Sequence, residues 1–259
     1  MSDLKKTFDE VIANKVRAFP EKARVIERAR KDGRLLAVRG SMDYVEKVLP
    51  YCYAAEKTVV DPEGKPPELS GFDVIFIGCP GKLHLEHWKQ PLLTFVTDGG
   101  VLLTTDWCLK NVIQKLFPQT IRKQGSIGGK FPLRMRNAGH PLLEGIADIQ
   151  DRLWIIEGMS YRIGIVDLKS VEVLLDAPEM GEPAAVLVAF PVGKGLVVHA
   201  ISHFHLQGSD ASGEYFSAYI LTNVIDEAIR RKRPELHPSR IKLIKSDVTD
   251  RPLRIRILK

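Results

Sequence analysis

The sequence predicts an α/β fold in which helices alternate with the strands of a mostly parallel sheet. Two apolar runs, Val74–Ile77 and Val101–Leu103, stop abruptly at small or polar residues. Strands that are buried on both faces of a parallel sheet have this pattern. Helical segments separate such runs in a β-α-β-α-β order, which implies right-handed crossovers. These observations together predict a site at the carboxyl ends of the strands.

The expected elements follow from apolar periodicity and from Gly and Pro stop signals. The chain is Gly-rich at 125–129 but lacks the Gly-Lys-Ser/Thr ending of a phosphate loop, so a turn is expected there. A hairpin is expected around 191–195. Helices are expected at 2–32 (with a break at Pro20 and a stop at Gly33), 42–49, 83–97 (interrupted near Pro91), 107–117 and 214–232. Strands are expected at 35–38, 53–60, 72–77, 101–105, 131–136, 153–156, 171–175, 184–190 and 196–201.

The net charge of +6 is concentrated at the C-terminus. Residues 230–259 contain eleven Lys and Arg against three Asp and Glu, whereas the first 229 residues carry about −2. A basic segment of this kind could contact nucleic acid or another anionic surface. No aromatic residues interleave its charges as they do in a base-stacking surface, which favours a solvated tail or an exposed edge. Nucleic acid is therefore considered as a partner only through this segment.

Cysteine usage and hydropathy predict a cytoplasmic protein. Cys52, Cys79 and Cys108 are odd in number and lack the spacing of metal ligands, as free thiols in a reducing compartment do. The longest apolar runs are far shorter than the roughly 20 residues of a membrane span, and the N-terminus has no apolar signal region. Neither a membrane partner nor a cofactor is expected, and the sequence does not predict an oligomeric state.

Three polar residues form the candidate catalytic group. Asp106 follows the strand at 101–105, His203 follows the second hairpin strand, and Glu157 interrupts an apolar run at 153–163. An aspartate that accepts the ring N–H of a histidine fixes one tautomer and raises its basicity. We therefore expect Asp106 and His203 to pair, with Glu157 nearby. The alternatives are a buried Asp–His hydrogen bond without chemistry, or an Asp106 that only caps the following helix.

Ligand-binding candidates occupy the same expected edge of the sheet. They follow strands or lie in turns: Arg39, Ser41, Gly78, Cys79, Gly81, Thr105, Trp107, Ser202, His205 and Gln207, with Trp154 and Ser160 joining from the 153–163 segment. Trp107 could stack on a flat or sugar-like ligand, or it could anchor the start of a helix in the core. His203 and His205, two residues apart, would face the same side of a strand and could share a metal ion with Asp106 or Glu157. We assign no metal site on this pattern alone.

Four motifs resemble the class I glutamine amidotransferase-like superfamily, including its trehalose-utilisation-like branch. Their order and spacing carry the resemblance over roughly residues 35–229: Phe72–Gly81, Gly99–Asp106, the His-Pro-x-x-x-Gly segment at 140–145, and Gly193–Gly195 with Val197–His203. The resemblance implies a flavodoxin-like three-layer sandwich. It also implies oxyanion-binding amides in the first motif and a catalytic histidine in the last. The expected division is an N-terminal helical extension (1–33), the amidotransferase-like domain (34–232) and a basic C-terminal extension (233–259).

One position departs from the family pattern. Asp106 stands where these amidotransferases carry the nucleophilic cysteine, and a carboxylate is a poor replacement for a thiolate in attacking an amide. Cys108 is expected in the first helical turn as a structural thiol. We therefore do not expect glutamine hydrolysis. The leading hypothesis is a domain that binds a small sugar-like or nucleotide-like ligand. The alternatives are a hydrolase or isomerase that uses Asp106 and His203, with or without a metal, and a non-catalytic protein-interaction scaffold.

Overall fold

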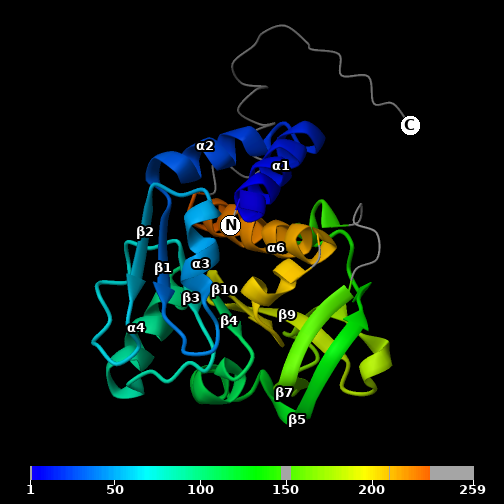
Figure 1. The fold of residues 1–259 in the computed structure, drawn as a ribbon. Helices are drawn as coiled ribbons and strands as arrows, with labels where there is room; N and C mark the ends of the chain where they lie inside the picture. Colours follow the sequence, from blue (N-terminus) through cyan, green and yellow to red (C-terminus); the bar gives the residue numbers. More distant parts are fainter. Residues whose placement is uncertain (1, 147–152, 210, 234–259) are drawn as a thin grey trace, which may run out of the picture.

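The computed structural model describes residues 2–146, 153–209 and 211–233. Its central sheet has eight strands in the order β2-β1-β3-β4-β10-β9-β8-β6, and a second sheet pairs β5 with β7 (Figure 1). The first five strands of the large sheet are parallel and the other three are antiparallel. The strands are β1 (Arg34–Val38), β2 (Glu56–Val60), β3 (Val74–Ile77), β4 (Val101–Thr105), β5 (Ile121–Pro132), β6 (Arg134–Met135), β7 (Leu153–Ile165), β8 (Glu172–Asp176), β9 (Ala185–Val192) and β10 (Gly195–Ala200).

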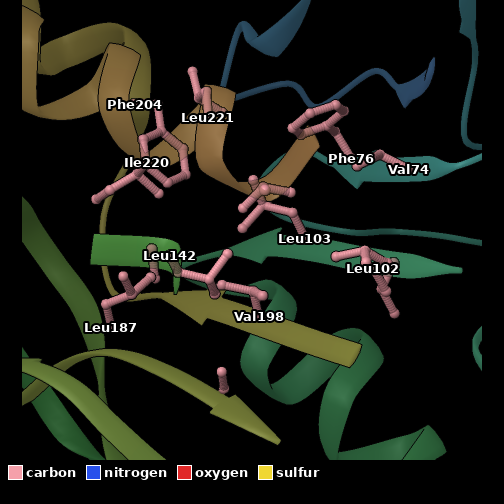
Figure 2. Close-up of a cluster of buried hydrophobic side chains, with 14 of the residues drawn as sticks. Val74, Phe76, Leu102, Leu103, Leu142, Leu187, Val198, Phe204, Ile220 and Leu221 are labelled. Atoms are coloured by element: carbon pink, nitrogen blue, oxygen red, sulfur yellow. The ribbon is translucent and has the colours of Figure 1, made fainter. Parts of the chain in front are cut away.

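Helices cover both faces of the large sheet because its central strands are apolar on both sides. Figure 2 shows Phe76 and Leu103 on the side of Ile220 and Leu221, whereas Leu102 points to the opposite face. The helices are α1 (Ser2–Ala18), α2 (Lys22–Asp32), α3 (Val45–Val48), α4 (Leu85–Thr97), α5 (Gln114–Leu116) and α6 (Ala211–Lys232). Shorter helical turns are η1 (Leu49–Tyr51), η2 (Leu109–Ile113), η3 (Pro141–Leu143), η5 (Pro178–Met180) and η6 (Phe204–Ser209). This three-layer α/β arrangement confirms the predicted fold class.

The two N-terminal helices pack on α6, on the side of that helix away from the sheet (Figure 1). Their apolar residues Phe8, Val11, Val25 and Ile26 are buried and belong to the same hydrophobic cluster as the sheet. The amphipathic spacing that predicted these helices therefore reflects burial against α6.

Several boundaries and one connection differ from the sequence-based expectation. Gly125–Gly129 is not a turn but part of β5, where two shifts in register against β7 mark β-bulges. The positive φ angles of Gly125 (90°) and Gly129 (144°) suit such irregular strand positions. Pro91 does not interrupt α4, which continues through it from Leu85 to Thr97. The proline removes one backbone hydrogen bond without ending the helix. The helix expected at 42–49 is reduced to α3 followed by η1.

The β9–β10 hairpin is confirmed as an antiparallel pair. Parallel pairing of β10 with β4 then brings Ala200 opposite Thr105, so that the residues following both strands lie together. The basic extension expected at 233–259 lies outside the described residues apart from Arg233. Within the described ranges, no helix has the length and apolar character needed to cross a membrane.

Candidate active site at the end of β4

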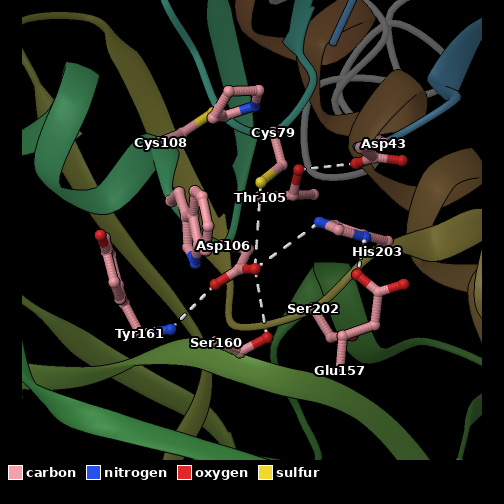
Figure 3. A network of polar contacts seen from close by, with 12 residues as sticks. Asp43, Cys79, Thr105, Asp106, Cys108, Glu157, Ser160, Tyr161, Ser202 and His203 are labelled. Atoms are coloured by element: carbon pink, nitrogen blue, oxygen red, sulfur yellow. Dashed lines mark hydrogen bonds and ion pairs between the residues drawn. The ribbon is translucent and has the colours of Figure 1, made fainter. Parts of the chain in front are cut away.

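Asp106 lies in a sharp turn directly after β4. Its φ angle is 43°, in the left-handed region that non-glycine residues rarely adopt, and its amide donates to Ala200 O at 2.8 Å. Such strained backbone is retained where surrounding contacts fix it, and it is concentrated at functional sites. The turn directs the carboxylate toward Ser160 and Tyr161 on one side and toward His203 on the other (Figure 3).

Hydrogen bonds from β7 hold the Asp106 carboxylate. Tyr161 N donates to Oδ1 at 2.9 Å and Ser160 Oγ donates to Oδ2 at 3.1 Å. The thiol of Cys79 lies 3.9 Å from Oδ2. These partners belong to other segments, so the side chain of Asp106 does not cap the following helical turn. The helix-cap alternative for this residue is therefore wrong.

His203 lies between two carboxylates, as Figure 3 shows. Its Nε2 is 3.7 Å from Asp106 Oδ2, and its Nδ1 is 2.8 Å from Glu157 Oε2. His203 is 1% exposed and Asp106 is 3% exposed, whereas the Glu157 side chain is 39% exposed. The three residues chosen from the sequence are thus adjacent, with Glu157 linking the buried imidazole to the surface.

Burial dominates the ionisation of this cluster. It raises the pKa of Asp106 to about 7, although the hydrogen bonds from Tyr161 and Ser160 oppose the shift. Burial lowers the pKa of His203, although the nearby carboxylates of Asp43 and Glu157 favour the charged ring. Burial also raises the pKa of the Cys79 thiol. A neutral imidazole beside a carboxyl that titrates near neutrality is suited to proton transfer.

A third acidic residue, Asp43, completes the polar network and was not predicted from the sequence. It is buried, accepts a hydrogen bond from Thr105 Oγ1 at 2.6 Å and lies 3.0 Å from Nδ1 of His205. The rings of His203 and His205 stack with centroids 5.7 Å apart. Because His205 faces Asp43, the two histidines do not converge on one point, and the His-x-His metal pair considered from the sequence is not formed. The position of Asp43, in the loop after β1, was the available signal.

Aromatic residues form the wall beside the turn. The Trp107 and Tyr161 rings stack at 5.6 Å, and the Lys123 ammonium lies 3.8 Å from the Tyr161 ring centroid. Trp107 Nε1 donates to Met159 O at 3.0 Å. These contacts attach β7 to the Asp106 turn, and Tyr161 was not among the predicted site residues.

The Gly-x-Pro-Gly turn after β3 is used differently from the expectation. The amides of Gly78 and Gly81 donate to Val38 O and Gly78 O, respectively, so they are already satisfied within the chain. Neither amide is therefore free to bind an oxyanion in this arrangement of the chain. Gly81 has a φ of 68°, and a Cβ there would lie 2.7 Å from Cys108 Sγ. Cys108 is fully buried and donates to Ile77 O at 3.4 Å, as expected for a structural thiol.

The remaining candidates lie at the margin of the site or support its scaffold. Arg39 is exposed and pairs with Asp61 at 2.7 Å, and Ser41 is also exposed. Ser202 and Gln207 both hydrogen-bond Ile155 O and so fix β7 in place. Trp154, expected near the site, is instead buried against Phe204 and Phe216 in the core. The apolar residues around Trp154 in the sequence are consistent with a position either in the core or at the site.

No known family model and no curated protein matches the sequence. Solved structures match the fold at low identity. The PurLQS structure from Thermotoga maritima has a TM-score of 0.58 at 12% identity, covering 74% of this chain and 97% of that chain. A protein from Bacteroides uniformis described as ThuA-like has a TM-score of 0.55 at 11% identity, covering 74% and 91%. A Thermoplasma acidophilum protein described as a GMP synthase subunit has a TM-score of 0.52 at 11% identity, covering 74% and 94%.

These neighbours have class I glutamine amidotransferase-like folds, and this chain has the same fold. The resemblance seen in the sequence is thereby confirmed at the level of architecture. Because the identities are so low, the chemistry must be argued from this chain's own residues.

Proposed function

We propose that this chain is an acid–base enzyme, a hydrolase or an isomerase, that acts on a small polar molecule at Asp106 and His203. The observation that carries the proposal is the alignment of Asp106, His203 and Glu157 at a turn with a positive φ angle. A structural hydrogen bond alone needs neither the strained turn nor a second carboxylate on the far side of the imidazole. The strain is a cost that a role in chemistry would explain.

The roles follow from the contacts. Glu157, 2.8 Å from Nδ1, favours the proton on that nitrogen and leaves Nε2 to act as a base toward Asp106 or a substrate. When His203 takes a proton, Glu157 stabilises the imidazolium, as the orienting carboxylate of a catalytic triad does. Asp106 supplies the acid, or holds the water or hydroxyl that His203 deprotonates. Substrate would enter beside Glu157, the exposed member of the group.

The same contacts argue against glutamine hydrolysis. The resemblance would require a cysteine thiolate at the turn, but Asp106 stands there. Burial raises the pKa of both Cys79 and Cys108, so without a bound metal ion these two neighbours remain thiols and do not supply the thiolate nucleophile. We propose that this chain uses the fold to act on a substrate class other than glutamine.

A second candidate function, binding without catalysis, is favoured by the aromatic wall. The stacked Trp107 and Tyr161 rings with Lys123 over Tyr161 form an apolar and cationic surface next to Asp106. Sugar-like and nucleotide-like ligands bind to such surfaces. On this hypothesis Asp106 and His203 would accept and donate hydrogen bonds to the ligand without transferring a proton.

The test is a panel of chromogenic esters, phosphate esters, lactones and glycosides, followed by variants against any substrate that turns over. We expect His203→Ala to lower kcat/KM by roughly 10²- to 10⁴-fold, the usual contribution of a general acid or base. His84→Ala, at an exposed histidine on α4's N-terminal side, should leave kcat/KM unchanged. Turnover that survives in His203→Ala would show that the proposed site is not responsible.

If the panel is negative, a thermal-shift screen with sugars and nucleotides separates the two candidates. Stabilisation by a ligand that is lost in Asp106→Ala supports binding without catalysis. A screen in which no ligand stabilises the wild-type protein contradicts both functions.

A further inference from the structure

Three potential metal ligands converge in the buried part of the site. Cys79 Sγ, Asp106 Oδ2 and His203 Nε2 all lie within 4.8 Å of one another, and all three residues are buried. The separation is 3.9 Å from Sγ to Oδ2 and 3.7 Å from Nε2 to Oδ2. They come from the ends of three neighbouring strands, β3, β4 and β10, so the sheet itself sets their spacing. They are far apart in the sequence, and no short motif predicts that they come together.

A second observation points into the same space. Both ring nitrogens of His203, which is 1% exposed, are buried and have no hydrogen-bond partner among the described residues; Nδ1 lies 2.8 Å from Glu157 Oε2, whereas Nε2 has no contact that close. Buried polar atoms in folded proteins nearly always have a partner. Nε2 lies 3.7 Å from Asp106 Oδ2, which is 3.9 Å from Cys79 Sγ, and a cation between these three residues would satisfy the nitrogen.

The surroundings resemble the support that metal ligands usually have. Metal-binding histidines commonly contact a carboxylate through their other ring nitrogen, which fixes the tautomer and orients the ring. Glu157 lies 2.8 Å from Nδ1 of His203 and provides that contact. Tyr161 N holds Oδ1 of Asp106, and Oδ2, which accepts from Ser160 Oγ, keeps a second lone pair that could bind a metal.

The ligand set selects the kind of ion. Thiolate and imidazole favour borderline-soft ions such as Zn²⁺, whereas Mg²⁺ and Ca²⁺ prefer oxygen ligands. Zinc bonds of about 2.0–2.3 Å in tetrahedral geometry place ligand atoms about 3.3–3.8 Å apart, so two of the observed separations need to contract by only tenths of an ångström. Binding would release the Cys79 thiol proton to solvent, giving a dication neutralised by one thiolate and one carboxylate.

We propose that Cys79, Asp106 and His203 bind one Zn²⁺-like divalent ion, with Glu157 as a positioning residue and a fourth coordination position open. Three protein ligands with an open position are typical of catalytic zinc. This inference rests on the proposed function in that it names the cofactor of the same site. It concerns binding, however, and can be tested without a substrate.

The test is titration of the chelator-treated full chain with Co²⁺ and Zn²⁺. We expect one Co²⁺ per chain with a thiolate-to-cobalt charge-transfer absorption, and displacement of Co²⁺ by Zn²⁺. Cys79→Ser should abolish that absorption, and Glu157→Gln should weaken binding by about 10- to 100-fold. Cys108→Ser is the matched control, because this buried thiol lies next to the site but donates to Ile77 O; it should retain the absorption.

Absence of stoichiometric binding to the wild-type protein would overturn the proposal, whatever the variants do. An absorption that persists in Cys79→Ser would also overturn it. The outcome is separable from the acid–base function. Metal binding without turnover or ligand binding leaves the zinc site standing alone, whereas full activity in metal-free protein supports the acid–base site and excludes the metal as its cofactor.

Discussion

Asp106→Asn should raise the free energy of unfolding of the chelator-treated protein at about pH 8, by an amount of the order of 4 kcal/mol. Burial raises the pKa of Asp106 from 3.8 to about 7 in the folded chain. Each pKa unit corresponds to about 1.4 kcal/mol, so a rise of about 3 units lowers the free energy of unfolding of the charged form by roughly 4 kcal/mol. Asparagine has almost the same shape and can still accept from Tyr161 N through its carbonyl oxygen. It avoids the cost of burying a negative charge and, in addition, it can donate to the unpartnered Nε2 of His203.

The gain should depend on pH in a defined direction. Between the unfolded and the folded pKa values the native carboxyl binds more protons than the unfolded one, so wild-type stability falls as the pH rises through this window. The advantage of Asp106→Asn should therefore be small near pH 4 and complete above pH 7. Chemical denaturation at both pH values measures it. Asp61→Asn, at a carboxylate that is 70% exposed, is the control and should change stability by less than about 0.5 kcal/mol. A variant less stable than the wild type at pH 8 would contradict a charge-destabilised site.

Asp226→Asn should lower the free energy of unfolding by about 3–5 kcal/mol, the usual cost of leaving a buried charge unpaired. Asp226 on α6 lies 2.7 Å from Lys15 Nζ on α1 and 3.3 Å from Lys22 Nζ on α2, and Tyr53 also hydrogen-bonds it. Burial alone would raise the pKa of Asp226, but the two lysines hold it below its usual value. Burial lowers the pKa of Lys15 to about 8 despite this partner. This cluster fastens both N-terminal helices to the domain.

The double variant Asp226→Asn/Lys15→Met separates charge from packing. Replacing both members of the closest pair removes one uncompensated charge, so it should be less destabilised than Asp226→Asn alone. Asp9→Asn, at an exposed residue paired with Lys5 on α1, should cost about 0.5 kcal/mol or less. Denaturant unfolding curves measure all three variants. If Asp226→Asn lies within about 1 kcal/mol of the wild type, the ion cluster does not hold these helices.

The sequence predicted the parts of the site that follow central strands. The apolar runs of β3 and β4 and the β9–β10 hairpin fix where Asp106 and His203 fall, because parallel pairing aligns the carboxyl ends of neighbouring strands. Glu157 was found because a single carboxylate interrupts an apolar run. These three residues could be predicted because each is marked by the local pattern of apolar and polar residues in the sequence.

The missed contacts depended on tertiary arrangement. The β7 side chains that contact Asp106 are set by the register and the bulges of the β5–β7 ribbon. The sequence predicted a turn at 125–129 instead of a strand, so this ribbon was not expected. Tyr161 could therefore not be assigned to the site. Trp154 and Glu157 lie on the same strand, but one faces the core and the other the site, and a shift of register would exchange faces. The convergence of the Cys79 thiol with His203 likewise requires coordinates.

The decisive measurement is the tautomer of His203 in metal-free wild-type protein, read from the ¹⁵N chemical shifts of its ring. With Glu157 next to Nδ1, we expect a neutral ring that carries its proton on Nδ1, with an unprotonated Nε2 facing Asp106. Glu157→Gln should reduce that preference. A ring protonated on Nε2 alone, in which Nδ1 carries no proton, would contradict the arrangement on which both the acid–base function and the metal site depend.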